Sequence, residues 1–497
     1  GSEGGWVPGD DGEAYIIDSF DGQTFDMARV RTRYFEKVSD TEWTRTLIFA
    51  RERYFVVFDE VEIQDGSSHK LTMQWHGNGG GTSGGQFDPG ATNPVRWTYG
   101  DAGVDVFSYA VGGFPDYASD EKIHDAGGWA EKTHSRWLVS IEAPQTTFAS
   151  VLFPFESAEA DRHSLAPACA AAHLACADVI PDNSGDGPHD RVYARPRASE
   201  FSEIPGCEGL SSDGEQFASF CDPESKDSDN PWAAVSAVYI GHGSSLKRLE
   251  TDMLSSDRPF TALIERERWG DGTLHGHYGV DGGGTAQLEI SGLTQYVETR
   301  GLCCTAEGFG MIDSGDFEIA PAENGNICHL VLKARVSPQV EAPNPWNPIP
   351  HVMQNETVDI DISPSCNIAG ELEGSLEIIE RPWYSSAVPD GMSITPDYPG
   401  DYILKVSATD DAETASLLLR FHALPAEEEE TEEESEFEGD GDGEIDAVYE
   451  EAAEEEIEYE AAEIEDGDEE FDGEAAEEKE SEPEDEAETY IEEDESA

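Results

Sequence analysis

The most regular pattern of apolar and polar positions lies at residues 41–62, TEWTRTLIFARERYFVVFDEVE. Two runs rich in β-branched and aromatic residues are joined at Arg51, Glu52 and Arg53. Such a pair of runs predicts an antiparallel hairpin. The second run, YFVVF, is apolar at successive positions and therefore on both faces of a strand, as expected of a central strand covered on two sides.

Short runs of this kind, separated by Gly, Asp and Pro, recur along much of the chain. They favour an all-β fold, and their number favours stacked sheets that form one large antiparallel β-sandwich over residues 1–336. The runs predicted to be strands are 14–18, 28–38, 43–50, 53–61, 69–76, 94–99, 103–110, 135–142, 146–153, 233–240, 260–267, 274–280, 285–290 and 327–335.

The strand rhythm stops over about residues 156–231, which are rich in Asp, Ser and Pro. We interpret this segment as an insertion stapled by disulfides, with one helix-like stretch around 164–177.

The inserted segment holds four of the eight cysteines, and none of the eight forms a CxxC pair. Disulfides in an oxidising compartment are therefore the expected use, which predicts an extracellular or cell-surface protein, with the periplasm as the alternative. The spacing does not fix the pairing.

A second unit is predicted at residues 337–424. In PGDYILKVSATDD the residues Tyr402, Leu404 and Val406 alternate toward an inside, and the length suits a small Ig-like β-sandwich. From Pro425 to Ala497 the chain is Glu-rich with few aromatic residues. Such a tail has too little apolar surface to fold, so we expect disorder over 425–497.

The net charge of the chain is −79, and the tail, with 40 acidic residues and one Lys, accounts for −39 of it. The body therefore carries −40, which argues against nucleic acid as a partner because it repels phosphate. No run of eighteen apolar residues occurs, so no membrane span is predicted. The chain begins Gly-Ser without Met, and we expect a processed product or a piece of a longer protein.

A local basic stripe stands out against this charge. Arg29, Arg31 and Arg33 alternate at period two and share one face of a strand, and Arg45 lies on the next run. These four arginines are candidate ligands for a carboxylated or sulfated sugar. Pairing with acidic residues on neighbouring strands is the favoured alternative. Asp59 is expected to accept hydrogen bonds from an Arg such as Arg45.

The segment DNSGDGPHD, 182–190, has the spacing of a calcium loop without its closing Glu. The candidate Ca²⁺ ligands are Asp182, Ser184, Asp186 and Asp190. A plain acidic turn is an equally good interpretation.

The order of several motifs resembles a known family. TRTLIFARERYFVVFDEVEIQDGSSHKLTMQWHGN, followed by PVRWTYGDAGVDVFSY, SRWLVSIEAPQTTFASVLFPF, AVYIGHG and FTALIERERWGDGTLHGHYG, is similar to the β-sandwich region of heparinase II/III-type polysaccharide lyases. The resemblance covers roughly residues 10–155 and 232–320. It implies β-elimination on an anionic, uronic-acid polysaccharide, with further catalytic groups supplied by a helical toroid. No such helical domain is recognisable in this sequence, so an N-terminal helical domain or a partner chain is implied.

The resemblance implies a catalytic role for His76, at the end of the strand that follows the Val-Val-x-Asp strand. The family often has a second His two residues later, where this chain has Asn78, which weakens the case for a zinc site but leaves Zn²⁺ open. His124 and His134 lie where the family can place another site histidine. His275 and His277 would share a strand face as a metal pair, although a solvated face is the favoured interpretation.

Two functions remain open. In the first, the chain is the β-sheet portion of a secreted polysaccharide lyase-like protein and is incomplete as an enzyme by itself. In the second, it is a non-catalytic surface, adhesion or structural protein with a sugar-binding sandwich and an Ig-like stalk.

Overall fold

The computed structural model describes residues 13–426 with internal gaps. The gaps are 35–40, 91–92, 124–132, 157–159, 161, 169–173, 183–186, 198–202, 223–229, 268–271, 294–295, 341–348, 365–371 and 410–412. The predicted tail therefore lies outside the described residues from 427 onward, as do Ser184, Asp186 and His124. Within the described residues the regular structure is β-strand apart from a short 3-10 turn at Cys207–Gly209, which confirms the all-β prediction.

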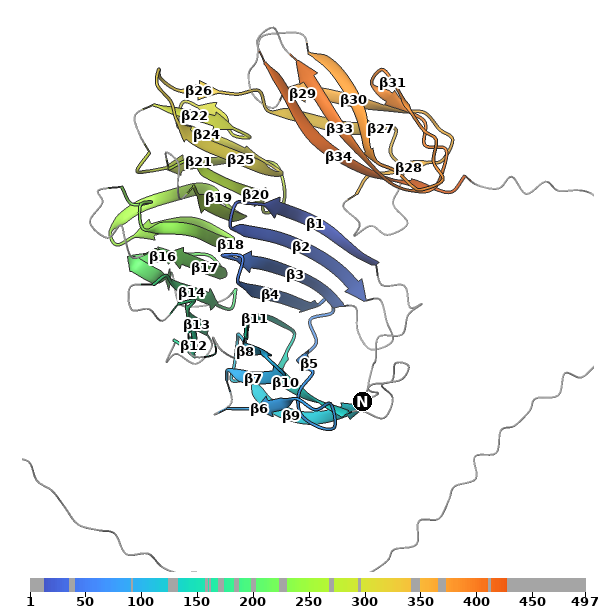
Figure 1. Ribbon diagram of the computed structural model, residues 1–497. Helices are drawn as coiled ribbons and strands as arrows, with labels where there is room; N and C mark the ends of the chain where they lie inside the picture. Colours follow the sequence, from blue (N-terminus) through green and yellow to red (C-terminus); the bar gives the residue numbers. More distant parts are fainter. Residues whose placement is uncertain are drawn as a thin grey trace, which may run out of the picture. The chain divides into compact units, whose positions relative to one another are not determined.

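The predicted hairpin lies inside an eight-stranded antiparallel sheet of the described chain (Figure 1). In spatial order this sheet contains β1 (Glu13–Asp21), β2 (Phe25–Tyr34), β3 (Thr41–Ala50), β4 (Tyr54–Ile63), β11 (Gln145–Glu156), β8 (Ala102–Ala110), β7 (Val95–Tyr99) and β6 (Gln86–Asp88). Strand β4 pairs with β3 and β11, so it is central. Tyr54, Val56 and Phe58 on one face and Val57 on the other are buried, which confirms coverage on two sides.

The second large sheet has fifteen strands among the described residues. Its main path is β12 (Ser164–Pro167), β13 (Ala175–Ile180), β14 (His189–Ala194), β17 (Gln216–Cys221), β18 (Val235–Arg248), β19 (Thr251–Arg266), β20 (Leu274–Val280), β25 (Ser314–Pro321), β22 (Val297–Arg300) and β26 (Ile327–Cys328). Strands β15 (Ile204–Pro205), β16 (Leu210–Ser212), β21 (Thr285–Ile290), β23 (Cys303–Thr305) and β24 (Gly308–Ile312) branch from this path.

The helix-like stretch predicted around 164–177 is wrong in its described part, which forms β12 and the start of β13. Ala175, Ala177 and Val179 alternate into the core that the two large sheets share. Small side chains allow the sheets to approach closely here, and this packing outweighs the helix propensity of alanine. The segment 156–231 thus contributes strands to the second sheet, although its sequence shows little strand rhythm.

Aromatic side chains join the two large sheets. Phe25 of β2 contacts Phe220 of β17, with ring centroids 4.7 Å apart, and Phe58 of β4 stacks on Tyr239 of β18 at 5.3 Å. All four rings are fully buried or nearly so. Burial of side chains this large is a principal source of stability for a sandwich.

A three-stranded sheet is formed by β5 (His69–His76), β10 (Thr133–Ala143) and β9 (Asp116–Ile123) in the described chain. One face of this sheet, with Trp137 and Val139, packs on Trp97, Val106 and Phe148 of the eight-stranded sheet. The opposite face, which carries His76, is polar.

Residues 332–424 form two further four-stranded sheets among the described residues. One contains β27 (Leu332–Ser337), β29 (Val358–Pro364), β32 (Ser393–Ile394) and β31 (Pro389–Asp390), and the other contains β28 (His351–Met353), β34 (Thr414–Leu424), β33 (Gly400–Thr409) and β30 (Glu373–Glu380). The predicted inward residues Tyr402, Leu404 and Val406 are buried in the core between them, which confirms that pattern.

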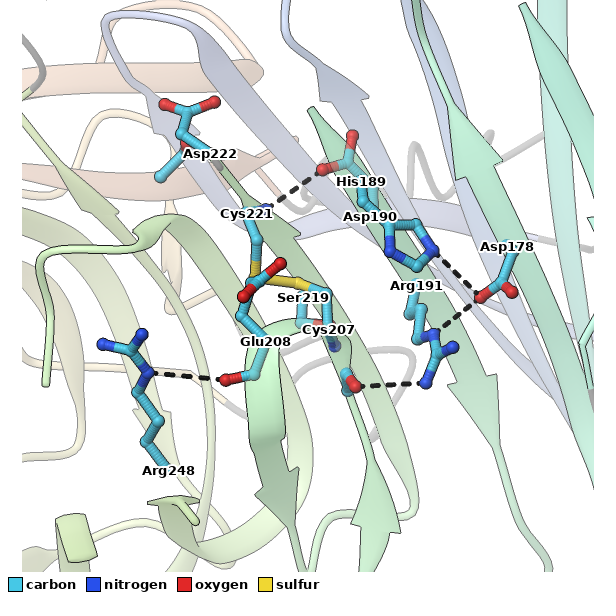
Figure 2. Close-up of a disulfide and its surroundings, with 12 residues drawn as sticks. Asp178, His189, Asp190, Arg191, Cys207, Glu208, Ser219, Cys221, Asp222 and Arg248 are labelled. Atoms are coloured by element: carbon cyan, nitrogen blue, oxygen red, sulfur yellow. Dashed lines mark hydrogen bonds and ion pairs between the residues drawn. A yellow bond between two sulfur atoms is a disulfide. The ribbon is translucent and has the colours of Figure 1, made fainter. Parts of the chain in front are cut away.

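Disulfides staple the second sheet and its branch. Cys207 bonds to Cys221 at the end of β17, and Cys304 bonds to Cys328. Figure 2 shows the first of these beside the buried carboxylate of Asp190, which accepts a hydrogen bond from the Cys221 amide at 3.1 Å. Among the described residues no cysteine is a free thiol.

Candidate functional site

His76 ends strand β5, and its exposed ring lies on the polar face of the three-stranded sheet. Its Nδ1 atom is 2.8 Å from Nε2 of His134, which is only 4 % exposed. The pairing of β5 with β10 places His76 opposite Arg136, so that His134, two residues earlier on β10, lies diagonally across on the same face. The fold thus brings together two histidines that the sequence separates by 58 positions.

The chain directly after His76 requires glycine for two different reasons. A Cβ at Gly77 would lie 2.2 Å from the Trp97 ring, so only glycine allows this close approach. Gly80 has a φ of +76°, and a Cβ there would overlap the hydroxyl of Ser135 on β10. Hydrogen bonds between this loop and β10, such as Ser135 N to Gly79 O at 2.9 Å, then fix the end of β5 and the position of His76.

Charged and polar groups surround His76 on this face. Arg136 donates to both carboxylate oxygens of Asp120 and, at 2.9 Å, to Oε1 of Gln74. The hydrogen bond from Arg136 lowers the pKa of Asp120 below its usual value. This leaves a strand face with imidazole, guanidinium and amide groups of fixed geometry.

The His76–His134 hydrogen bond couples the two rings chemically. A neutral imidazole has one N–H and one acceptor nitrogen, so the proton that one ring donates determines which tautomer the other adopts. The Nε2 atom of His76 therefore carries a proton in one arrangement and an acceptor lone pair in the other. A proton donor and a proton acceptor are both groups that elimination next to a carboxylate needs.

The predicted basic stripe is paired with acidic residues wherever its side chains are described. Arg29 is 8 % exposed and donates to Asp18 at 2.7 Å. Arg31 lies 3.5 Å from Glu42. The side chain of Arg33 lies outside the described part of the structure. Sugar binding by these residues stays a prediction.

Arg45 forms the expected partnership with Asp59. The guanidinium donates to both oxygens of that fully buried carboxylate, at 2.6 and 3.2 Å, and the Trp43 indole donates at 2.7 Å. Burial raises the pKa of Asp59, while the hydrogen bonds from Arg45 and Trp43 oppose the rise. These contacts give Asp59 the structural role that the sequence predicts.

Of the four predicted calcium ligands, Asp182 and Asp190 lie within the described residues. Asp182 is exposed, whereas Asp190 is fully buried on β14. Asp190 accepts hydrogen bonds from Arg51 and the Tyr54 hydroxyl in addition to the Cys221 amide. Three protein donors therefore already occupy this carboxylate. Within the described residues no cluster of three or more His, Cys, Asp or Glu has the arrangement of a metal site.

Calcium binding by 182–190 stays a prediction with a direct test. Millimolar CaCl₂ is expected to raise the melting temperature by mass action, and Asp186→Ala is expected to abolish the increase. Differential scanning fluorimetry with MgCl₂ as the ionic control makes the measurement. An unchanged melting temperature in CaCl₂ would leave the plain acidic turn as the interpretation.

A charged cluster between the two large sheets was missed by sequence reasoning. His242 has a φ of +53° at an irregularity of β18, and its ring nitrogens lie 2.9 Å from Glu60 and 2.8 Å from Asp281. His277, for which a solvated face was the favoured interpretation, is instead buried, and Asp18 at 3.2 Å and Asp316 at 2.8 Å hold it in a similar way. The only local signal was the His between two glycines in AVYIGHG, because the acidic partners come from distant strands.

Comparisons with known proteins add a likeness to solved structures. No protein-family description matches the sequence, and no curated protein matches it. The heparan sulfate lyase HepC from Pedobacter heparinus is 15 % identical, with a TM-score of 0.26, over 34 % of this chain and 26 % of that one. Heparinase III is 12 % identical, with a TM-score of 0.28, over 37 % of this chain and 27 % of that one. The chain thus spans about a quarter of the length of these structures. Within the described residues no helix has the length and hydropathy of a membrane span.

Proposed function

We propose that this chain is the β-sheet portion of a polysaccharide lyase-like protein that acts on or binds uronic-acid polysaccharides outside the cytoplasm. The observation that carries the proposal is the exposed imidazole of His76, which contacts His134. It lies at the strand end where the family resemblance implies a catalytic histidine. The disulfides Cys207–Cys221 and Cys304–Cys328 support an extracellular or periplasmic location.

The proposed role of His76 follows from the chemistry of β-elimination. Removal of the proton next to a uronic carboxylate creates an enolate-like intermediate, so the site needs both a base and a group that neutralises the carboxylate. His76 supplies one of these groups. A helical domain or partner chain supplies the others, and no unsaturated product is expected from this chain alone. In the assembled enzyme, His76→Ala is expected to lower kcat by about 10²–10⁴-fold, the usual contribution of a general acid or base.

The test separates binding from chemistry. Alginate and heparan sulfate are mixed with the chain at low and high salt, and retardation in an affinity gel and ultraviolet absorbance of the unsaturated product are recorded. We expect weak retardation that falls as salt rises, no absorbance change, and weaker retardation for His76→Ala. His69→Ala, a second histidine on β5 that bonds to Ser67, is the matched control and should bind as the parent does. Strong product formation by this chain alone contradicts the proposed division of labour.

The second candidate is a non-catalytic surface or adhesion protein whose 337–424 region is an Ig-like stalk. A specific observation favours the Ig-like interpretation of that region. The hydroxyl of Tyr402, near the start of β33, donates to the Tyr398 carbonyl at 2.9 Å, as in the tyrosine corner of Ig-like sandwiches. If the chain binds uronic polymers equally well with and without His76, and adding a helical domain brings no activity, this candidate replaces the first.

A further inference from the structure

A group of exposed aromatic side chains lies on the C-terminal sandwich, in the loop 381–388 that joins β30 to β31. Trp383 is 92 % exposed and Tyr384 is 76 % exposed. Tyr398, just before β33, is 41 % exposed, and its ring centroid lies 5.7 Å from that of Tyr384. Tryptophan is highly buried on average in folded proteins, and exposed apolar groups with a polar rim mark interaction sites.

Hydrogen bonds tie the loop that carries Trp383 and Tyr384 to the core of the sandwich. Asp397 accepts hydrogen bonds from the hydroxyl of Ser385 at 2.5 Å and from the amide of Ser386 at 2.7 Å. The hydroxyl oxygen of Tyr402, which is fully buried and stacked on Phe421, lies 3.0 Å from the Ser385 hydroxyl oxygen. The loop backbone is thus tied to the core of the sandwich while its aromatic rings face solvent.

Such a combination suits a preformed binding surface. A loop backbone that is already fixed loses little conformational freedom when a ligand arrives, which leaves more of the contact energy for affinity. Aromatic faces are flat and carry partial negative charge, so they stack on the C–H faces of pyranose rings, whose hydrogens carry partial positive charge.

The charges around the rings decide the class of sugar. Glu380 and Asp390 flank the loop in the sequence, and both are exposed. Arg381, the basic residue of the loop, donates to the carbonyl of Ala387. An acidic rim repels uronic-acid polymers, nucleic acids and anionic membranes, and it leaves neutral sugars unaffected.

We propose that Trp383, Tyr384 and Tyr398 form a binding platform for a neutral polysaccharide built of pyranose rings. The platform is independent of His76 and of the proposed lyase-like function. It would attach the protein to a neutral glycan, whereas the polar face that carries His76 would bind an acidic one.

The experiment uses the full chain in native affinity gels that contain xylan, a mixed-linkage β-glucan, galactomannan or mannan, with alginate as the acidic comparison. We expect retardation by at least one neutral polymer, unchanged between low and high salt. Trp383→Ala combined with Tyr384→Ala should weaken that binding by at least about ten-fold, as for aromatic hot spots. Both side chains are exposed, so the melting temperature should stay within about 1 °C of the parent.

Two controls sharpen the outcome. Tyr99→Ala removes another aromatic ring, 52 % exposed on β7, and should bind as the parent does. Asp397→Asn keeps the rings and loosens their support, so it should weaken binding less than the double variant. The proposal is overturned if no neutral polymer retards the chain or if the double variant binds normally. It is also overturned if the double variant only abolishes self-association in light scattering, because the patch would then be a protein contact.

Discussion

Replacing Asp190 by Asn is expected to lower the free energy of unfolding by about 3–5 kcal/mol, the usual effect of removing one partner of a buried ion pair. The Arg51 guanidinium reaches from the β3–β4 hairpin and donates to both oxygens of Asp190 at 2.8 Å. Burial would lower the pKa of Arg51, but the Asp190 charge raises it, so the guanidinium stays charged. Asn keeps the size of the side chain and leaves Arg51 without its main countercharge. Asp222, 3.2 Å from Arg51, still provides a countercharge in the variant, so we expect a loss near the lower end of this range.

A neighbouring carboxylate provides the matched control. Asp178 on β13 pairs with Arg191 at 2.7 Å, but its side chain is 28 % exposed (Figure 2). Asp178→Asn is expected to cost at most about 1 kcal/mol, because exposed pairs contribute little. Urea unfolding followed by circular dichroism compares the two variants with the parent. Equal losses would show that Arg51 and Asp190 do not join the two large sheets energetically.

Raising the pH from 6 to 10.5 is expected to remove about 4 kcal/mol of stability that depends on His242. Burial alone would lower the pKa of His242, but its hydrogen bonds to Asp281 and Glu60 outweigh burial and raise the pKa to about 10. An unfolded histidine titrates near pH 6.5. The folded protein therefore holds the proton more tightly. The resulting stabilisation is complete below about pH 6.5 and disappears as the pH rises toward 10.

The variant His242→Asn isolates this contribution from other groups that titrate over the same range, including His277. Asn tolerates the left-handed backbone of position 242, so the substitution removes the charge without adding backbone strain. The stability difference between parent and variant should be largest at pH 6 and small at pH 10.5. His69→Asn, on β5 of the three-stranded sheet, is the control for the loss of one histidine elsewhere in the fold. A difference that stays constant with pH would assign His242 a role in packing alone.

Local patterns of apolar and polar residues were sufficient to predict most strands of the eight-stranded sheet. Alternation and β-branched residues in 41–62 predict a central hairpin, and β3 and β4 occupy those positions. The same reasoning failed at 164–177, because alanine fits both a helix and a strand that packs closely against another sheet. Strands β14, β16 and β17 were also missed, since their short runs lack a clear alternation in a segment rich in Asp, Ser and Pro.

Only part of the candidate site could be predicted from the sequence. The order of the motifs pointed to His76 at a strand end, but its contact with His134 depends on how β5 and β10 pair. The basic stripe shows the same limit. Its period-two spacing places Arg29 and Arg31 on one face, yet it does not tell which carboxylate each meets or that Arg29 is buried between sheets.

The sequence by itself determined the all-β class, the central hairpin, the inward row at Tyr402 and the strong negative charge, because these depend on side-chain periodicity and composition. Only the tertiary structure decided which distant groups meet. Arg51 and Asp190 are 139 residues apart in the chain, and the aromatic platform exists because Asp397 and Tyr402 hold a loop from a neighbouring strand. Strand periodicity is a local property of the backbone, whereas contacts between sheets depend on register and packing that no short segment encodes.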